Sequence, residues 1–591
     1  MSDPSLTNNT PAEQNSSYVG AADAELLASR PWIRHYEEGV PVTLELPERP
    51  LTYLLDNAAS RYPGHTALYY FGTRITYARL SNLANRFAIG LQRLGVQKGD
   101  RVAISLPNIP QYPIAFFGAL RAGAVVVPTN PMYTSHELRH QLKDSGAKVL
   151  VALDMFYPRV REIRHETALE HIIVTSPADY LPTLLRTLYP LSQRKQKPEK
   201  PLTDKEIQDD PGLHVMRTIL AEQTRGGVEL FNLPVPARSS DLAVLQYTGG
   251  TTGQAKGAML THGNLLANAY QTRYWTPKAQ EGTEVTLCAA PFFHSYGLTV
   301  GMNLSLLIGA TMVLVPQFKA RQIVDVIRRT HPTLFPGIPT MYIAIMREVG
   351  KHTDYLQSIK FCISGAAPLP AQVQHDFEEM SGAKVVEGYG LSEASPVTHC
   401  NPLTEACRNG SIGLPLPGID ARIMDVTSHQ FLPVGEVGEI VVRGPNIMQG
   451  YWNREGETRD IFVDGWMRTG DIGKMDEDGY FYVVDRAKDL ILASGFNVYP
   501  REIEEVLFRH PRVAEAAVIG IPDEYRGETV AAFVVLKDGN KPSEEIRQEI
   551  IAFCKQELTN YKVPKVIEFR EQLPKSMVGK VLRRELRTTR Q

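Results

Sequence analysis

The sequence predicts a protein of the α/β class. Short apolar runs typical of buried strands alternate with stretches that have the spacing of amphipathic helices between residues 76 and 151. Strands and helices that alternate in this way form a parallel sheet with helices on both faces. The 591 residues are too many for one hydrophobic core. A chain of this length predicts roughly three or four folding units, several of which share one large body.

The predicted elements follow in order. Trp32 and Tyr36 are expected to anchor the first ordered segment. Thr76 is the predicted N-cap of a helix whose apolar positions recur as far as Leu94, and Gly95 ends it. The next elements are a strand at 101–106, a helix near 111–121, an apolar run at 124–127, a helix near 136–145 and an apolar run at 149–151. Near the C-terminus, a helix at 502–508 and strands at 514–519 and 530–536 indicate a smaller α+β unit.

Composition excludes several classes of protein. Lys+Arg 63 against Asp+Glu 65 gives a net charge of -2, which argues against a general affinity for nucleic acid. Five scattered cysteines without CxxC spacing indicate neither a disulfide framework nor a zinc site, and they fit a reducing cytoplasm. The tail, residues 1–30, is expected to be disordered or loosely packed, and its start lacks the basic and apolar regions of a secretory signal.

Two segments bear on membrane contact. Val300–Pro316 is interrupted by polar and glycine residues and is shorter than the ~20 apolar residues of a spanning helix, so a buried helix followed by a strand is expected. Residues 178–200 carry leucines that run into a basic stretch, a pattern suited to an anionic membrane surface. Pro182 and Pro190 are expected to break any long helix there, and a surface loop that packs its leucines locally is an equal alternative.

The strongest local signal is a glycine- and threonine-rich stretch, YTGGTTGQAKG, at residues 247–257. It follows an apolar run at 242–245, and its small residues let backbone N–H groups converge on phosphate oxygens. Threonine hydroxyls add donors and Lys256 adds a mobile positive charge. Ala255 before the lysine and Gly257 after it exclude a Walker loop. A solvated turn is the alternative, because glycine and threonine are common in turns.

A second stretch, VVEGYGLSE at residues 385–393, has the residues of a nucleotide site. The ring of Tyr389 can stack on a purine, Ser392 can bond a phosphate oxygen, and Glu393 offers a hard oxygen ligand to Mg²⁺. Taken alone, the tyrosine is more commonly a core residue and the glutamate a solvated charge.

Four further stretches carry weaker signals. Residues 361–368 read as a strand that enters a small-residue turn with room for a flat ligand. Asp471 follows a tight turn and can accept hydrogen bonds from two ribose hydroxyls, although a plain Gly-Asp turn explains it too. His294 lies among aromatic residues, where a satisfied core histidine is more common than a functional one. The basic end, LPKSMVGKVLRR at 573–584, is by composition a solvated terminus.

These motifs, in this order and across roughly Leu51 to Leu586, resemble those of AMP-forming acyl-CoA synthetases. The stretch at 247–264 resembles the variant carried by bacterial long-chain fatty-acid–CoA ligases. The resemblance implies a large N-terminal domain of two α/β sheets plus a distorted β-barrel, at 31–487, and a small mobile α+β C-terminal domain at 488–591. It implies a ligase that uses ATP, Mg²⁺ and CoA to convert a fatty acid to acyl-AMP and then to acyl-CoA.

Residue roles come from the resemblance, position by position. It implies that Lys580, Ser392 and Glu393 are catalytic, that Glu393 binds the metal, that Lys488 is the hinge, and that His294 and Tyr296 face the acyl substrate. The implied nucleotide-binding residues are Thr248, Gly249, Gly250, Thr251, Thr252, Gly253, Lys256, Gly365, Ala366, Ala367, Gly388, Tyr389, Gly390, Asp471 and Arg486.

The sequence departs from the family pattern at three places. Leu298 stands where some members carry a tryptophan channel gate, Ser392 stands where threonine is more common, and Ser576–Val578 replaces a threonine-rich run.

The alternatives to a long-chain fatty-acid–CoA ligase are a medium-chain or aryl carboxylate–CoA ligase, an acyl-AMP ligase that loads a carrier protein, and a catalytically silent nucleotide- or lipid-binding protein. A cytoplasmic location, with contact at the inner face of the membrane, and a homodimer are further expectations.

Overall fold

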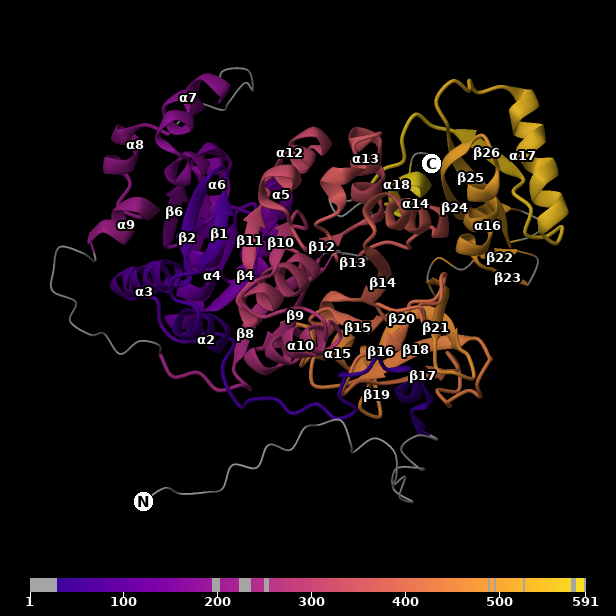
Figure 1. Ribbon diagram of the computed structural model, residues 1–591, viewed down its shortest axis with the longest axis horizontal. Helices are drawn as coiled ribbons and strands as arrows, with labels where there is room; N and C mark the ends of the chain where they lie inside the picture. Colours follow the sequence, from indigo (N-terminus) through magenta and orange to yellow (C-terminus); the bar gives the residue numbers. More distant parts are fainter. Residues whose placement is uncertain are drawn as a thin grey trace.

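The computed structural model describes residues 29–193, 202–222, 235–248, 255–486, 489, 491–493, 496–523, 527–575 and 581–588. Their strands form four sheets (Figure 1). In Figure 1 the seven-stranded sheet and one edge of the nine-stranded sheet lie toward the left, the C-terminal sheet lies at the upper right, and the five-stranded sheet lies below the C-terminal sheet. The predicted α/β class, with several units in one body and a smaller C-terminal unit, is confirmed.

The seven-stranded sheet has the order β7-β6-β5-β3-β4-β8-β9 and is parallel except for its last pair. Its central strands are buried, as their apolar runs predict, because helices cover both faces of a parallel sheet. The strands are β3 (Arg101–Ser105), β4 (Val125–Pro128), β5 (Val149–Leu153), β6 (His171–Thr175), β7 (Leu213–Val215), β8 (Leu242–Thr248) and β9 (Lys256–Thr261).

The nine-stranded sheet has the order β16-β15-β14-β13-β12-β10-β11-β1-β2, with parallel central strands and antiparallel edges. The carboxyl ends of its parallel strands β13 and β14 run into the two small-residue stretches that the sequence singles out. The strands are β1 (Thr66–Tyr70), β2 (Thr73–Thr76), β10 (Val285–Cys288), β11 (Thr311–Leu314), β12 (Leu334–Gly337), β13 (Phe361–Ser364), β14 (Lys384–Gly390), β15 (Val397–Cys400) and β16 (Leu414–Pro415).

The remaining two sheets are smaller. The five-stranded sheet is antiparallel and stands where the resemblance implies a distorted barrel: β17 (Asp420–Met424), β18 (Gly438–Arg443), β19 (Phe462–Val463), β20 (Trp466–Met475) and β21 (Phe481–Arg486). The C-terminal sheet has its own buried core: β22 (Ile491–Ala493), β23 (Phe496–Val498), β24 (Val513–Asp523), β25 (Gly527–Leu536) and β26 (Val566–Phe569).

Helices cover these sheets, and the helix at Tyr77–Arg93 has the N-cap residue that the sequence predicts. The side chain of Thr76 accepts a hydrogen bond from the N–H of Arg79 at 3.3 Å, which confirms the predicted N-cap. The helices are α2 (Tyr53–Arg61), α3 (Tyr77–Arg93), α4 (Gln111–Arg121), α5 (Ser135–Ser145), α6 (Tyr157–Ile163), α7 (Thr183–Gln193), α8 (Asp204–Asp209), α9 (Met216–Glu222), α10 (His262–Tyr274), α11 (Leu304–Leu307), α12 (Ala320–Thr330), α13 (Pro339–Val349), α14 (Ala371–Ser381), α15 (Glu455–Ile461), α16 (Pro500–Arg509), α17 (Glu544–Glu557) and α18 (Arg583–Thr588).

Three expectations about particular segments can be judged. Trp32 is buried against Phe481, and the Tyr36 hydroxyl donates to the Pro415 carbonyl at 2.7 Å, so both anchor the N-terminal segment. The apolar window is a buried π-helical turn and α11 followed by β11, as predicted. Among the described residues, no helix combines the length and apolar character needed to cross a membrane.

The expectation that both prolines interrupt the 178–200 segment is wrong for one of them. Helix α7 begins directly after Pro182 but runs through Pro190 to Gln193. Proline removes one backbone donor from a helix and does not prevent its continuation where the rest of the turn is formed. Residues 183–193 of this segment are therefore a helix of 11 residues and not a loop, and 194–200 lie outside the described residues.

Candidate functional site

The glycine-rich stretch is the connection of a β-hairpin. Strands β8 and β9 pair antiparallel, and Thr248 lies opposite Lys256 at the base of the connection. Gly257 lies against the ring of Tyr247, where an added Cβ would come within 3.1 Å of ring carbon. The Tyr247 hydroxyl donates to Asp144 at 2.6 Å. These contacts fix the two ends of the stretch, whereas Gly249, Gly250, Thr251, Thr252 and Gly253 lie outside the described residues.

The Lys256 side chain extends toward a segment far along the chain. Its ammonium group forms an ion pair with Glu457 of α15 and lies 5.2 Å from the centre of the Tyr451 ring. A cation over an aromatic face is attracted by the electron density of the ring. Lys256 is therefore held between a carboxylate and an aromatic ring.

Glu393 is positioned by the 3-10 turn Ser392–Ala394, which follows β14 and contacts both β8 and β9. Its side chain is only 9% exposed. The Tyr451 hydroxyl donates to Glu393 Oε1 at 2.8 Å, and the Met448 N–H donates to the Glu393 carbonyl at 2.8 Å. A carboxylate has two oxygens, so this side-chain hydrogen bond leaves the second oxygen for a ligand.

Tyr389 and Asp471 meet, although they come from different sheets. The Tyr389 hydroxyl donates to Asp471 Oδ2 at 2.6 Å. Asp471 lies on β20, directly opposite Arg486 on β21. The two residues predicted to contact the purine and the ribose are therefore neighbours, and the backbone of Arg486 lies beside them.

The glycines around Tyr389 are required by close packing. A Cβ at Gly390 would lie 2.1 Å from the carbonyl oxygen of Pro396, and one at Gly388 would lie 2.9 Å from Ile363. No side chain fits at that first distance without movement of the backbone. The glycines thus let strand β14 run close to β15 and β13.

The small-residue turn after β13 packs on an aromatic ring. A Cβ at Gly365 would lie 2.9 Å from the ring of Tyr296, and Ala366 has φ +65°, a left-handed conformation that is uncommon outside glycine. Ala367 follows in the same turn and is partly buried. The Tyr296 hydroxyl donates to the Ile363 carbonyl at 2.6 Å, so the ring and not the hydroxyl is the part available to line a substrate site.

His294 lies near Ser392 because its chain neighbour, Ser295, contacts Ser392. The Ser295 and Ser392 hydroxyl oxygens are 3.3 Å apart, which places the aromatic-histidine segment beside the Glu393 turn. The N–H of Tyr296 donates to Nδ1 of His294 at 3.2 Å, so this ring nitrogen acts as an acceptor. The predicted acyl-facing and phosphate-facing residues are therefore adjacent.

Buried ionisable groups surround this region. Burial raises the pKa of Glu387, on β14, to about 7. Arg501 of α16 and a hydrogen bond from the Leu369 N–H oppose that rise. Burial lowers the pKa of His399 to about 3, so this histidine is a neutral ring against Tyr389.

The oxygen donors of the site fit a magnesium ion whose ligands come partly from the protein and partly from a bound substrate. Glu393 offers one carboxylate oxygen, which is the kind of ligand Mg²⁺ prefers. In the ranges that the structure describes, no group of three or more His, Cys, Asp or Glu side chains could hold a metal ion alone. Mg²⁺ is usually bound through one or two carboxylates plus substrate phosphates, which matches this arrangement.

The structure brings together Thr248, Lys256, Ser392 and Glu393 on one side and Tyr389 and Asp471 on the other. Lys488 and Lys580 lie outside the described residues, and Arg486 is described only through its backbone. Sequence reasoning missed Ser295, Tyr451 and Glu457. Tyr451 lies in the short stretch Gly-Tyr-Trp at 450–452, and nothing in that stretch indicates that it reaches the Glu393 turn.

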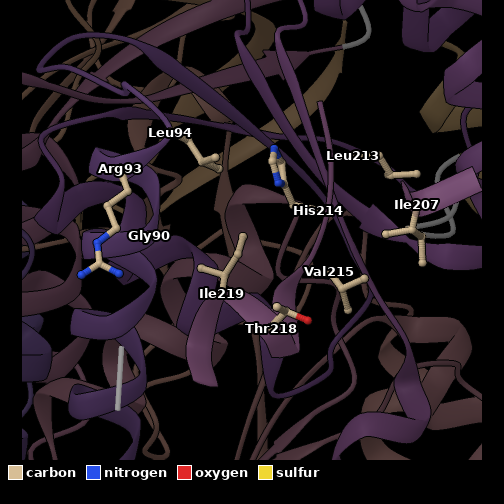
Figure 2. Close-up of a pocket in the computed structure, with 9 residues that line it drawn as sticks. All are labelled: Gly90, Arg93, Leu94, Ile207, Leu213, His214, Val215, Thr218 and Ile219. Carbon is tan, nitrogen blue, oxygen red and sulfur yellow. The ribbon is translucent and has the colours of Figure 1, made fainter. Parts of the chain in front are cut away.

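A separate cavity of about 210 Å³ lies between α3, α8, β7 and α9 (Figure 2). Figure 2 shows Gly90 and Arg93 on one side and Leu213 and Val215 on the other. None of the site residues predicted from the sequence lines it. The complete lining is Gly90, Arg93, Leu94, Ile207, Leu213, His214, Val215, Thr218 and Ile219.

Comparison with known proteins places this fold and site in one family. The AMP-binding enzyme family matches residues 55–452, and the C-terminal domain of AMP-binding enzymes matches residues 502–580. The chain belongs to the AMP-binding enzyme family. The resemblance to adenylate-forming acyl-CoA synthetases is therefore confirmed.

Individual relatives are similar over almost their whole length. The long-chain-fatty-acid–CoA ligase of Bacillus subtilis (strain 168) is 45% identical, with 95% of this chain and 98% of the relative covered. ATP-bound MatB from Rhodopseudomonas palustris is 31% identical with TM-score 0.78, over 91% of this chain and 98% of that one. An anthranilate CoA ligase in complex with anthranoyl-AMP is 27% identical with TM-score 0.79, over 92% and 98%.

Proposed function

We propose that the protein is an AMP-forming long-chain fatty-acid–CoA ligase. The observation that carries this proposal is the convergence of the phosphate-loop hairpin, the Glu393 turn and the Tyr389–Asp471 pair on one site. A nucleotide bound there would have its base and ribose at Tyr389 and Asp471 and its phosphates toward Lys256. The relative of Bacillus subtilis, named a long-chain-fatty-acid–CoA ligase, supports the fatty-acid substrate.

The chemistry solves a leaving-group problem. A carboxylate is unreactive toward a thiol because its oxygen would leave as a strong base. In the first step a carboxylate oxygen attacks the α-phosphorus of ATP, the bond to pyrophosphate breaks, and a mixed anhydride, acyl-AMP, forms. In the second step the CoA sulfur attacks the acyl carbon, the thiol proton is released, and AMP leaves.

Each residue has a proposed task in these steps. Thr248 and Lys256, at the base of the phosphate loop, would hold the departing pyrophosphate, and Ser392 would donate to a phosphate oxygen. Glu393 would hold Mg²⁺, which when bound neutralises negative charge on the phosphates. His294 and the Tyr296 ring would border the acyl carboxylate. Asp471 would accept from the ribose hydroxyls, with Arg486 as a second ribose contact.

The proposal extends to Lys580 and to the domain that carries it. Residues 488–591 would form a mobile domain that turns about Lys488, bringing Lys580 to the α-phosphate for adenylation and withdrawing it for thioester formation. Lys580→Ala should then lower the adenylation half-reaction far more than the thioester half-reaction supplied with acyl-AMP. Equal losses in the two half-reactions would contradict this role.

The decisive experiment is CoA-dependent AMP release from ATP with purified protein, across saturated acids from acetate to stearate and with benzoate as an aryl acid. Maximal kcat/KM at palmitate supports the proposal. Activity confined to medium-chain or aryl acids would support the assignment as a CoA ligase but overturn the long-chain substrate. Acyl-AMP formation without use of CoA would instead indicate a ligase that loads a carrier protein.

Membrane contact at α7 is a second part of the proposal. Leu184, Leu185 and Leu188 on this helix are 71%, 42% and 48% exposed, so they do not pack locally. Phe71, in the β1–β2 turn, is also exposed. The turn adjoins α7, because a Cβ at Gly72 would lie 3.7 Å from the Pro182 ring. Such an apolar surface suits insertion at a lipid interface.

The charges beside this patch favour an anionic membrane. Arg186 on α7 and Arg74 on β2 are exposed, and the basic run at 194–200 follows outside the described residues. Each basic side chain near an anionic surface contributes about 1 kcal/mol. The location proposed is therefore cytoplasmic, at the inner face of the membrane.

Sedimentation with vesicles tests the membrane part. Wild-type protein should pellet with vesicles that contain phosphatidylglycerol and less with pure phosphatidylcholine. Leu184→Glu/Leu188→Glu should lose this binding, whereas Val434→Glu, at an exposed apolar residue of another surface, should retain it. Equal binding by the wild type and the α7 variant would overturn the contact. Sedimentation equilibrium of the wild type tests the proposed homodimer.

A further inference from the structure

The segment 446–452 lies between the phosphate-loop hairpin and the Glu393 turn. On one side it pairs with β9: Gln449 N–H donates to the Met259 carbonyl at 3.0 Å, and the Trp452 N–H donates to the Gly257 carbonyl at 2.8 Å. The N–H of Met259 donates in return to the Gly450 carbonyl at 2.9 Å. The segment therefore continues the sheet at the edge that leads out of the phosphate loop.

On its other side the same segment holds the Glu393 turn through three hydrogen bonds. The Asn446 side-chain amide donates to the Ala394 carbonyl at 2.7 Å. The Met448 N–H donates to the Glu393 carbonyl, and the Tyr451 hydroxyl donates to Glu393 Oε1, both at 2.8 Å. The first two bonds fix the backbone of the turn, and only the third acts on the carboxylate itself.

Tyr451 has the properties of a fixed donor. Its side chain is 8% exposed. An ionised carboxylate can only accept hydrogen bonds, so the phenol hydroxyl is the donor to Glu393 Oε1. The face of the same ring lies 5.2 Å from the Lys256 ammonium. One side chain thus touches both the metal-binding carboxylate and the phosphate-binding lysine of the proposed site.

We propose that Tyr451 is a positioning residue for the magnesium complex of ATP. Its hydroxyl fixes one oxygen of Glu393 so that the second oxygen faces the ion, and its ring keeps Lys256 on the phosphate side of that carboxylate. This inference rests on the proposed function, in which Glu393 binds the metal. Hydrogen bonds from outside the ligand shell orient metal ligands, and their loss typically costs about 10- to 100-fold in metal affinity or activity.

Calorimetric titration of the full chain with ATP tests the role without turnover. ATP is titrated once in excess Mg²⁺ and once in EDTA, in the absence of fatty acid and CoA, and the ratio of the two affinities measures the linkage to Mg²⁺. Tyr451→Phe keeps the ring and removes only the hydroxyl. It should reduce this ratio by about tenfold or more and leave the affinity in EDTA unchanged.

Trp452→Phe is the matched control. It also removes one ring donor from the same segment, the indole N–H that donates to the Asp144 carbonyl at 3.2 Å, but that bond points away from Glu393. The control should keep the wild-type ratio. In a Glu393→Gln background, which should itself lack the linkage, Tyr451→Phe should have no further effect.

Three results would overturn the inference. An unchanged ratio in Tyr451→Phe would do so, as would an equal loss of ATP affinity with and without Mg²⁺, which would indicate a purely structural role. In either case loss of the linkage in Glu393→Gln leaves the proposed metal site intact. Retention of the full linkage in Glu393→Gln would remove the metal assignment, and the positioning role with it.

Discussion

Replacement of Glu387 by glutamine is expected to stabilise the protein above neutral pH. Glu387 lies on β14, within the stretch at residues 385–393, and its side chain is buried. Burial raises the pKa of its carboxyl group from 4.5 to about 7, because the loss of hydration outweighs the attraction of Arg501 and the hydrogen bond from the Leu369 N–H. Glutamine has the same shape and can still accept that hydrogen bond, but it carries no charge.

The direction and the size of this change in the free energy of unfolding follow from proton linkage. Between pH 4.5 and about 7 the folded protein binds the Glu387 proton more tightly than the unfolded chain does. The free energy of unfolding therefore falls as pH rises through this window and stays low above it. A rise of this size corresponds to at most about 3 kcal/mol. The variant lacks the penalty, so its advantage over the wild type should be near zero at acidic pH and greatest above neutral pH.

Urea unfolding monitored by tryptophan fluorescence, at constant ionic strength from about pH 5 to about pH 8, measures this difference. Glu405→Gln, at a fully exposed side chain, serves as control and should follow the wild type at every pH. If the midpoints of Glu387→Gln and the wild type stay parallel across the window, the buried carboxyl is not a titrating group of the folded state and the reasoning is refuted.

Two other predictions concern the site. Gly390→Ala would place a Cβ 2.1 Å from the Pro396 carbonyl oxygen, and overpacking of this kind should cost about 1–3 kcal/mol. A lower thermal midpoint is expected, whereas Gly456→Ala, which meets nothing within 4 Å, should not lower it. Glu457→Gln should release Lys256 from its ion pair and raise the ATP affinity up to about fivefold in calorimetry. A weaker affinity would mean that Glu457 helps to place the lysine.

The parts of this fold that the sequence predicts are those with local signals. Thr76 accepts the capping hydrogen bond expected of it, and the helix at 111–121 has the predicted bounds. The glycines at 388 and 390 are recognisable because their spacing around a tyrosine is short-range. Such signals depend only on residues that are close in the sequence, so they can be recognised without the tertiary structure.

The features that escaped prediction depend on contacts between distant segments. Tyr451 reaches a carboxylate 58 residues away, and its own sequence surroundings resemble an ordinary packing motif. Helix α7 continues through Pro190 although the sequence favours a break there. Local patterns therefore reveal candidate site residues and miss the residues that contact them from distant parts of the chain.

The polar contacts of the site are also the contacts that join the sheets. Tyr389 to Asp471 links the nine-stranded sheet to the five-stranded sheet, and Tyr451 to Glu393 links the nine-stranded sheet to the segment that pairs with β9. A nucleotide that bridges these groups would bind only the assembled arrangement, and a ligand of the folded state stabilises that state by mass action. Weakened packing between the sheets and weakened nucleotide binding should therefore accompany each other, because the same side chains contribute to both.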